Sequence, residues 1–308
     1  VFASGKDRTS PNMHTNISLR STGEYLALRR IQGANVTLLS EFNDYPRQFF
    51  GLSYGVISPD LSTYKYLEVP SPGAENSGTS YSDYTRDTNF TVNRGIYTTA
   101  QTVEITSSTI GAEIRYTLDG TTPTPSTGTV YTGPISITTT TTLRAMASAP
   151  DFVPTNVDTH TYIFPADVVN QPANPPTWPP PTTSGQWLDY EMDAPGNVGV
   201  TGQVIIDALN AIPSLSIVTD QNNLTGPSGI YVNAGNRGVA WERPASLEMI
   251  LPPGVSDPDG LTENFQEDGG LRIRGGFSRS NGNPKHALRM LFKREYGSSR
   301  LEYPLFGS

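Results

Sequence analysis

Hydrophobic and polar positions alternate in short runs along the chain, and this pattern predicts many strands and few helices. The clearest case is Ile114, Tyr116 and Leu118, which fall on one face with polar residues between them. A period of two is typical of a half-buried strand. The run leads into Asp119-Gly120, a dipeptide that favours a tight hairpin turn. Further strands are expected at 135–137, 141–147 and 159–164, a spacing that fits a small two-sheet sandwich.

Near the N-terminal end the pattern predicts a β-hairpin and one more strand. Two β-prone runs, 25–28 and 36–39, flank Gly33, which tolerates the positive φ of a turn. Another strand is expected at 64–69. Residues 70–78 then bring prolines and glycines that cannot pair inside a sheet, so we place a domain boundary there.

Helical spacing appears clearly in one place, beyond a proline-rich stretch. Residues 171–181 contain six prolines and too few backbone donors for regular structure, which predicts an extended linker. After it, apolar residues recur at helical spacing from Ile205 to Ile212, and Pro213 ends the run. Strands return at 215–218, 245–251, 271–274 and 287–293, so this block is expected to be α+β.

The predicted fold class is therefore mainly β. We expect two Ig-like β-sandwich modules, the first one incomplete, followed by a partial α+β domain. The predicted boundaries are 1–78 and 79–165 for the two sandwich modules, 166–182 for the linker and 183–308 for the α+β part. Glycine (29) and proline (26) are frequent among the 308 residues, which agrees with short strands joined by turns.

Composition excludes several function classes. The chain has no cysteine, which excludes disulfides and thiol chemistry, and its three histidines are far apart, so we expect no metal centre. The net charge of −8 argues against a nucleic-acid partner. No apolar run reaches the roughly 20 residues that a membrane span needs. A chain poor in charge and rich in Thr, Ser, Asn and Gly is typical of secreted or cell-surface bacterial modules.

The middle block carries the most specific resemblance. Ile114-Arg115-Tyr116-Thr117-Leu118-Asp119-Gly120-Thr121-Thr122-Pro123, followed by Tyr131-Thr132-Gly133-Pro134-Ile135 and Thr141-Thr142-Leu143-Arg144-Ala145, resembles the chitobiase/β-hexosaminidase C-terminal-type Ig-like module. In that family the module is an accessory β-sandwich. The resemblance implies this architecture and a secreted setting, and it does not imply catalysis.

Residues 1–78 resemble the second half of a bacterial lamin-tail domain. The resemblance rests on the segments 1–8, 23–28, 53–55 and 70–76. Family members have several strands before the segment that Val1 matches. Half a sandwich would leave an unpaired sheet edge and an open core. We therefore expect upstream chain or a partner to supply the missing strands.

The last block is similar to the N-terminal part of the spore-coat CotH-like protein kinase family. The matching segments are 190–193, 212–218, 241–246, 274–279 and 285–289. The resemblance implies that the Arg-Gly turn and the lysine after it lie on the nucleotide side, with ATP and magnesium as ligands of the complete domain. The metal-holding acidic residues of the family come later, past Ser308, so we expect neither catalytic residues nor a cofactor within residues 1–308.

The candidate nucleotide-phosphate contacts come from this turn, because phosphoryl transfer needs cations and backbone donors around the phosphates. They are Arg274, Gly275, Gly276, Ser278, Arg279 and Lys285. The spacing is not that of a Walker loop. The alternative is a glycine-rich hairpin with a solvated basic strand, in which Leu288, Met290 and Phe292 point into the core.

Three further patterns favour a structural interpretation. Gly51-Leu52-Ser53-Tyr54-Gly55 fits a nucleophile motif, but the residues after it predict strand and turn in place of the required helix. The acidic residues of 257–268, and those of 189–193, have only part of a calcium-loop spacing. The tryptophans Trp178, Trp187 and Trp241 offer stacking surfaces for sugars, yet core or linker packing is the default expectation.

Three functions remain open at this point. The leading one is a structural, adhesive or interaction role outside the cell, with matrix, glycan or envelope partners. The second is part of an atypical secreted kinase in which Arg274, Arg279 and Lys285 contact ATP phosphates. The third is carbohydrate binding by the middle module.

Overall fold

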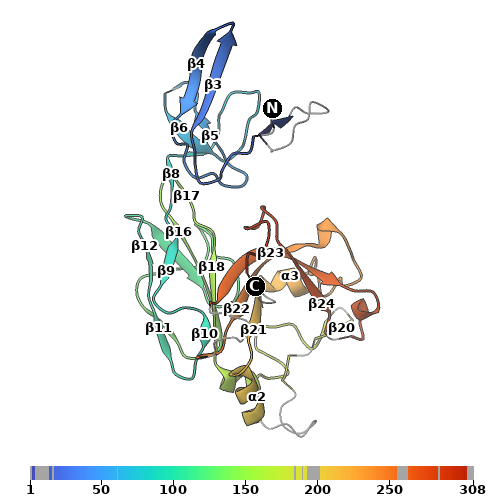
Figure 1. Cartoon of the computed structure of the whole chain (residues 1–308). Coiled ribbons are helices and arrows are strands. Elements are labelled where there is room, and N and C mark those ends of the chain that lie inside the picture. Colours follow the sequence, from blue (N-terminus) through green and yellow to red (C-terminus); the bar gives the residue numbers. More distant parts are fainter. Residues whose placement is uncertain are drawn as a thin grey trace. The chain divides into compact units, whose positions relative to one another are not determined.

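The computed structural model describes residues 2–3, 14–15, 17–60, 62–183, 185–188, 190–192, 202–254, 263–283 and 285–303. Strands make up 38% of it and helices 9%, so the protein is mainly β, as predicted. The chain divides into two compact units, residues 1–83 and residues 84–308 (Figure 1). The residues of β8 (Asp83–Tyr84) lie on either side of the boundary in the sequence.

The first unit contains the predicted hairpin. Strands β3 (Leu26–Gln32) and β4 (Asn35–Phe42) pair antiparallel across a turn in which Gly33 has a φ of 59°. A second sheet joins β5 (Ser53–Val56), β6 (Tyr64–Leu67) and β7 (Ser80–Tyr81). The short strands β1 (Phe2–Ala3) and β2 (His14–Thr15) pair in parallel. The small core of this unit lies at the β5–β7 sheet, where Tyr66 and Leu67 are buried.

The β3–β4 hairpin exposes large apolar side chains. Leu28 is 63% exposed, Ile31 is 72% exposed and Val36 is 57% exposed. These residues would normally be covered, because each buried apolar side chain stabilises a fold by about 1.5–3 kcal/mol. Within the described residues this hairpin therefore leaves apolar side chains uncovered, and the incomplete sandwich expected for residues 1–78 remains a prediction.

The second unit begins with a β-sandwich. One sheet has the strand order β10 (Gly95–Ile96), β18 (Asp158–Ile163), β16 (Thr141–Ser148), β13 (Glu113–Thr117), β14 (Thr129–Val130). The opposite layer consists of the antiparallel pairs β11 (Gln101–Val103) with β15 (Ile135–Ile137) and β12 (Ile105–Ser107) with β9 (Thr88–Phe90). Strand β17 (Phe152–Val153) is a further short element.

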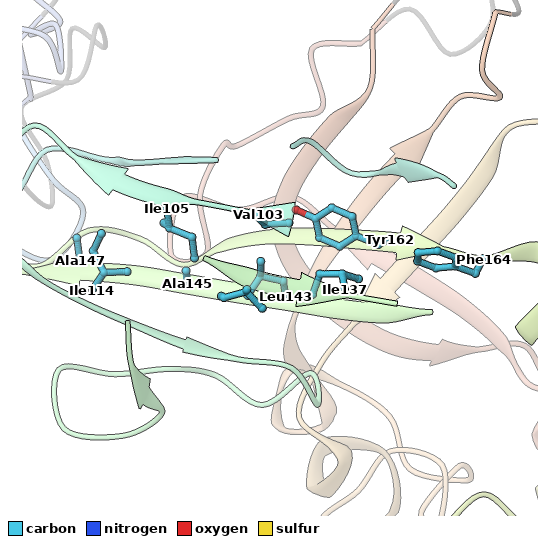
Figure 2. Packing of buried hydrophobic residues seen from close by; sticks show 10 residues of the cluster. Val103, Ile105, Ile114, Ile137, Leu143, Ala145, Ala147, Tyr162 and Phe164 are labelled. Atoms are coloured by element: carbon cyan, nitrogen blue, oxygen red, sulfur yellow. The ribbon is translucent and has the colours of Figure 1, made fainter. Parts of the chain in front are cut away.

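The sandwich core accounts for the alternation of hydrophobic and polar residues along its strands. Val103 and Ile105 on one layer pack against Leu143 and Ala145 on β16, and all four are at most 2% exposed. Figure 2 shows these side chains filling the space between the two layers of strands. Strands with one face in such a core keep the inward and outward alternation that predicted them.

The predicted tight turn at Asp119-Gly120 is wrong. Strand β13 pairs with β14 and with β16, so a longer loop over residues 118–128 separates β13 from its hairpin partner. Gly120 does have a positive φ of 81°, and the Asp119 carboxylate accepts a hydrogen bond from the Thr121 amide at 3.0 Å. The dipeptide makes a local Asx turn and does not reverse the strand.

The remainder of the second unit is an antiparallel four-stranded sheet. Its order is β21 (Ser214–Val218), β22 (Arg243–Ile250), β23 (Phe265–Arg274), β24 (Ala287–Leu291). A small hairpin of β19 (Thr182–Thr183) and β20 (Gln186–Trp187) precedes it. Five buried residues form the core of this sheet, namely Ile230, Ala234, Ala245, Leu271 and Ile273.

The helices differ from the expectation in number. The predicted helix is α2 (Gly202–Leu209), which ends before Ile212 and Pro213. Two five-residue helices were missed: α1 (Pro165–Val169), inside the expected linker, and α3 (Gln221–Thr225). Single turns η1 (Val239–Trp241) and η2 (Phe277–Arg279) complete the set. Pro165 starts α1 because a proline at the first helical position has no amide to leave unpaired. None of the described helices has the length and apolar character for crossing a membrane.

Candidate functional site

The predicted phosphate contacts lie at the turn that follows β23. Arg274 is the last residue of that strand and is exposed. Gly275 has a φ of 113°, and a Cβ atom on it would overlap the hydroxyl of Ser278. The position therefore requires glycine on both conformational and steric grounds. Gly276 then caps the single turn η2, whose last residue is Arg279. The Arg279 side chain reaches back to the carbonyl of Ile273 near the end of β23.

Arg279 holds this turn together through backbone carbonyl groups. Its Nε donates to the carbonyl of Gly275 at 2.7 Å, and its Nη1 donates to those of Ala234 and Asn236 at 2.7 and 2.8 Å. Its Nη2 donates to the carbonyl of Ile273. These bonds use four of the five guanidinium donors. Burial, and then the charge of the neighbouring Arg237, lower the pKa of Arg279. Arg279 is thus an organiser of the loop as well as a cation.

The structure brings some of the predicted residues together and leaves one apart. Arg274 and Arg279 line the same small cavity. Lys285 is exposed in the segment before β24 and is not among the residues that line this cavity. Leu288, which the alternative reading placed in the core, is 38% exposed. Met290 on the same strand packs against the sheet core. A nucleotide role for the six predicted residues remains a prediction.

A buried carboxylate beside this turn was not found from the sequence. The Glu242 side chain is 1% exposed and forms ion pairs with Arg272 and with Lys293, the latter at 2.5 Å. The hydroxyl of Tyr296 donates to the same carboxylate at 2.9 Å. Gly270 makes room for it, because a Cβ atom there would lie 2.5 Å from the Glu242 carboxyl carbon. Arg272, Lys293 and Tyr296 lie 30 to 54 positions after Glu242 in the sequence. A local sequence pattern does not predict such a cluster.

The charges of this cluster are mutually stabilised. Burial by itself would raise the pKa of Glu242, but hydrogen bonds from Lys293, Tyr296 and Arg272 outweigh it and leave the pKa below its ordinary value. The hydrogen bond to Glu242 raises the pKa of Lys293. Burial, together with the bond to Glu242, raises the pKa of Tyr296 to about 12. Glu242 and Lys293 therefore stay ionised at neutral pH and Tyr296 keeps its proton, while the Glu242 carboxylate fixes Arg272 in place.

A second buried carboxylate connects the sandwich to the C-terminal sheet. Glu248 on β22 has a fully buried side chain and pairs with Nε of Arg94 at 2.8 Å. Its carboxylate also accepts the amide of Thr161 on β18 at 3.0 Å, and the Thr161 hydroxyl. Arg94 in turn donates to the carbonyl of Thr159 at 2.9 Å. Burial raises the pKa of Glu248 against these contacts.

The other chemical candidates are not supported as sites. Ser53 lies on strand β5 with no helix after it, as the residues around it predicted. The acidic positions at 257–259, together with Asp189 and Asp193, lie outside the described residues. Within the part of the chain that the structure describes, no group of three His, Cys, Asp or Glu residues is placed to hold a metal ion.

The tryptophans do not share a platform. Trp178 is 45% exposed and packs edge-on against Tyr190, with ring centres 5.6 Å apart. Trp187 is 57% exposed, so the default expectation of core packing is wrong for it. Trp241 lies beneath the guanidinium of Arg243, 5.5 Å from the ring centre. Each of the three lines a different cavity.

One family model matches part of the chain. Residues 92–159 match the chitobiase/beta-hexosaminidase C-terminal domain, which confirms the resemblance predicted for the middle block. The matched segment contains most of the sandwich strands, including β13, β16 and the first two residues of β18. No curated protein and no solved structure matches the chain. A module of this type is typical of extracellular, carbohydrate-related proteins.

Proposed function

We propose that this chain belongs to a secreted or cell-surface modular protein with a structural and adhesive role. In this proposal the chitobiase-type sandwich is a support that holds the C-terminal sheet toward an extracellular partner. The observation that carries the proposal is the buried Glu248 carboxylate, which is held by Arg94 and Thr161 from the sandwich.

The energetic argument rests on the cost of burying charge. A carboxylate removed from water is tolerated only where a cation and hydrogen-bond donors surround it in fixed geometry. Here the carboxylate belongs to β22 and its donors belong to the sandwich, so separating the two would break the ion pair and both hydrogen bonds from Thr161. Asn264 adds a bond to the Arg94 carbonyl at 3.2 Å, and Asp220 accepts the Thr122 amide at 2.9 Å. These bonds favour a rigid support over a loosely tethered module.

The apolar β3–β4 hairpin supports an interaction role for the first unit. Its exposed residues Leu28, Ile31 and Val36 form a surface that additional β-structure would bury. We infer that strands from another segment or from a partner cover it, as the lamin-tail resemblance implies. The partner of the C-terminal part is expected to be a matrix, glycan or envelope component, in agreement with the family match of the sandwich.

The experiment is co-sedimentation of the purified chain with insoluble peptidoglycan, chitin and cellulose, combined with scanning calorimetry. We expect retention on at least one polymer and one unfolding transition for residues 84–308. Arg94→Leu should lower the temperature of that transition, and Arg300→Leu, which removes the exposed cation of a pair with Glu302, serves as the matched control. Absence of retention on all three polymers by a folded chain would contradict the adhesive role.

The kinase-related alternative has a separate test. If Arg274, Arg279 and Lys285 contact ATP phosphates in the complete domain, Lys285→Ala should weaken the binding of ATP with magnesium to the full-length protein. Titration calorimetry measures this binding. Unchanged binding would reject that role for Lys285.

A further inference from the structure

A small cavity beside the β23–β24 edge is lined by five arginines and no acidic side chain. Its volume is about 120 Å³, and the arginines are Arg237, Arg272, Arg274, Arg279 and Arg289, with Trp241 beside them. They come from β23, from β24, from η2 and from the loop before η1. The chain has 21 Lys and Arg residues and a net charge of −8, so this concentration of positive charge runs against its composition.

Two of the arginines are fixed by the protein. Arg279 is held by four backbone carbonyls, and Arg272 is held by the buried carboxylate of Glu242. Glu242 is also paired with Lys293, so it does not neutralise the cavity as a whole. The rear wall of the cavity is therefore rigid and cationic before any ligand arrives, which lowers the entropic cost of binding.

The other three arginines have side chains without a hydrogen-bonding or acidic partner among the described residues. Arg237, Arg274 and Arg289 are exposed at the cavity. Arg289 lies directly opposite Arg272 in the β23–β24 register. Like charges in that position repel each other across a sheet. An anion bound between the two guanidinium groups would offset this repulsion. Each guanidinium presents a fork of N–H donors that can bind such an anion.

The size of the cavity and the number of separate segments that supply its arginines indicate the ligand group. A volume of about 120 Å³ admits a single charged group and excludes a whole sugar or base. Guanidinium groups from four separate segments surround a tetrahedral oxyanion better than a planar carboxylate, which one or two forks satisfy. The indole of Trp241 at the same cavity offers an apolar face, and pyranose rings pack on such faces.

We propose that this cavity binds a phosphate or sulfate group carried by a sugar of an extracellular glycan, with Arg237, Arg274 and Arg289 as the ligand-contacting residues. Trp241 packs against the sugar ring, and Arg272 and Arg279 form the fixed wall. The sugar as the carrier rests on the proposed function, whereas the oxyanion site rests on the cavity alone.

The test uses the whole chain and soluble probes. Titration calorimetry and tryptophan fluorescence would be recorded with N-acetylglucosamine 6-phosphate, N-acetylglucosamine 6-sulfate, inorganic phosphate and neutral N-acetylglucosamine. We expect the charged sugars to bind more tightly than inorganic phosphate, the neutral sugar not to bind, and added salt to weaken binding. Arg274→Gln and Arg289→Gln should each weaken binding by about tenfold, because each removes a charge-assisted contact.

The matched control is Arg300→Gln, which removes an exposed arginine paired with Glu302 away from the cavity and should leave binding unchanged. The substituted arginines are exposed, and equal melting temperatures would show that the variants fold. Equal binding by wild type and by both cavity variants would overturn the site. Equal affinity for inorganic phosphate and for the charged sugars would overturn the sugar as the carrier.

Two further results separate this proposal from the others. Tighter binding of ATP with magnesium than of any charged sugar, lost in Lys285→Ala, would overturn it in favour of a nucleotide site. Retention on chitin or peptidoglycan without binding of any charged probe would overturn the oxyanion site and leave the adhesive role intact.

Discussion

The guanidinium of Arg94 donates to the fully buried carboxylate of Glu248 at 2.8 Å, across 154 positions of sequence. Arg94 precedes the first strand of the sandwich sheet, and Glu248 lies in the middle of β22 in the C-terminal sheet (Figure 1). Because this buried pair joins the two sheets, it makes the packing of β22 against the sandwich specific to this arrangement.

Removing the cation should be costly. Arg94→Leu leaves Glu248 charged and buried, and we expect a loss of about 3–5 kcal/mol in the free energy of unfolding. Urea unfolding followed by circular dichroism measures it. The double variant Arg94→Leu with Glu248→Leu should recover much of the loss. A single variant as stable as wild type would show that the pair does not hold the sheets together.

Acidification should stabilise the sandwich through Asp158. Burial raises the pKa of Asp158 from 3.8 to about 7. A carboxyl whose pKa is raised by folding binds its proton in the native state first, so stability falls as the pH rises from about 4 to 7, by roughly 1.4 kcal/mol per pKa unit.

Asp158→Asn isolates this contribution. The stability of wild type relative to the variant should increase as the pH is lowered from 7 to 4, in melting temperatures recorded across that range. The comparison is needed because His160 has the opposite effect: burial lowers its pKa to about 3, which costs stability on acidification below 6.5. A difference that does not change with pH would contradict the raised pKa of Asp158.

The space at Gly270 should be required for the Glu242 cluster. Gly270→Ala places a methyl group 2.5 Å from the Glu242 carboxyl carbon, and we expect a loss of about 1–3 kcal/mol by overpacking. Gly133→Ala is the control, because a Cβ atom there meets nothing within 4 Å. Thermal unfolding measures the melting temperatures of the two variants, and we expect the lower one for Gly270→Ala. Equal melting temperatures would show that Glu242 can move aside.

The exposed hairpin should matter for association and not for stability. Ile31→Thr keeps a β-branched residue at a position that is 72% exposed, so the free energy of unfolding should change by no more than about 0.5 kcal/mol. We expect lower binding of a hydrophobic dye and less self-association in sedimentation velocity, with Thr37→Ser as the control on the neighbouring strand. Unchanged dye binding would show that this surface is not the exposed apolar patch.

The sequence by itself determined the mainly β fold, the positions of the strands with five or more residues and the chitobiase-type module. Alternating residues such as Ile114 and Tyr116 carry this information because a strand's two faces meet different environments along a few consecutive residues. The short helices α1 and α3 were missed because five residues leave little periodic signal. The turn at Asp119 was wrong because a turn dipeptide does not show how far away the next paired strand begins. Only the tertiary structure decided that Glu248 meets Arg94, that Glu242 gathers Arg272 and Lys293, and that five arginines surround one cavity. Such contacts join residues far apart in the chain, and their energies depend on burial and direction, which no local pattern encodes.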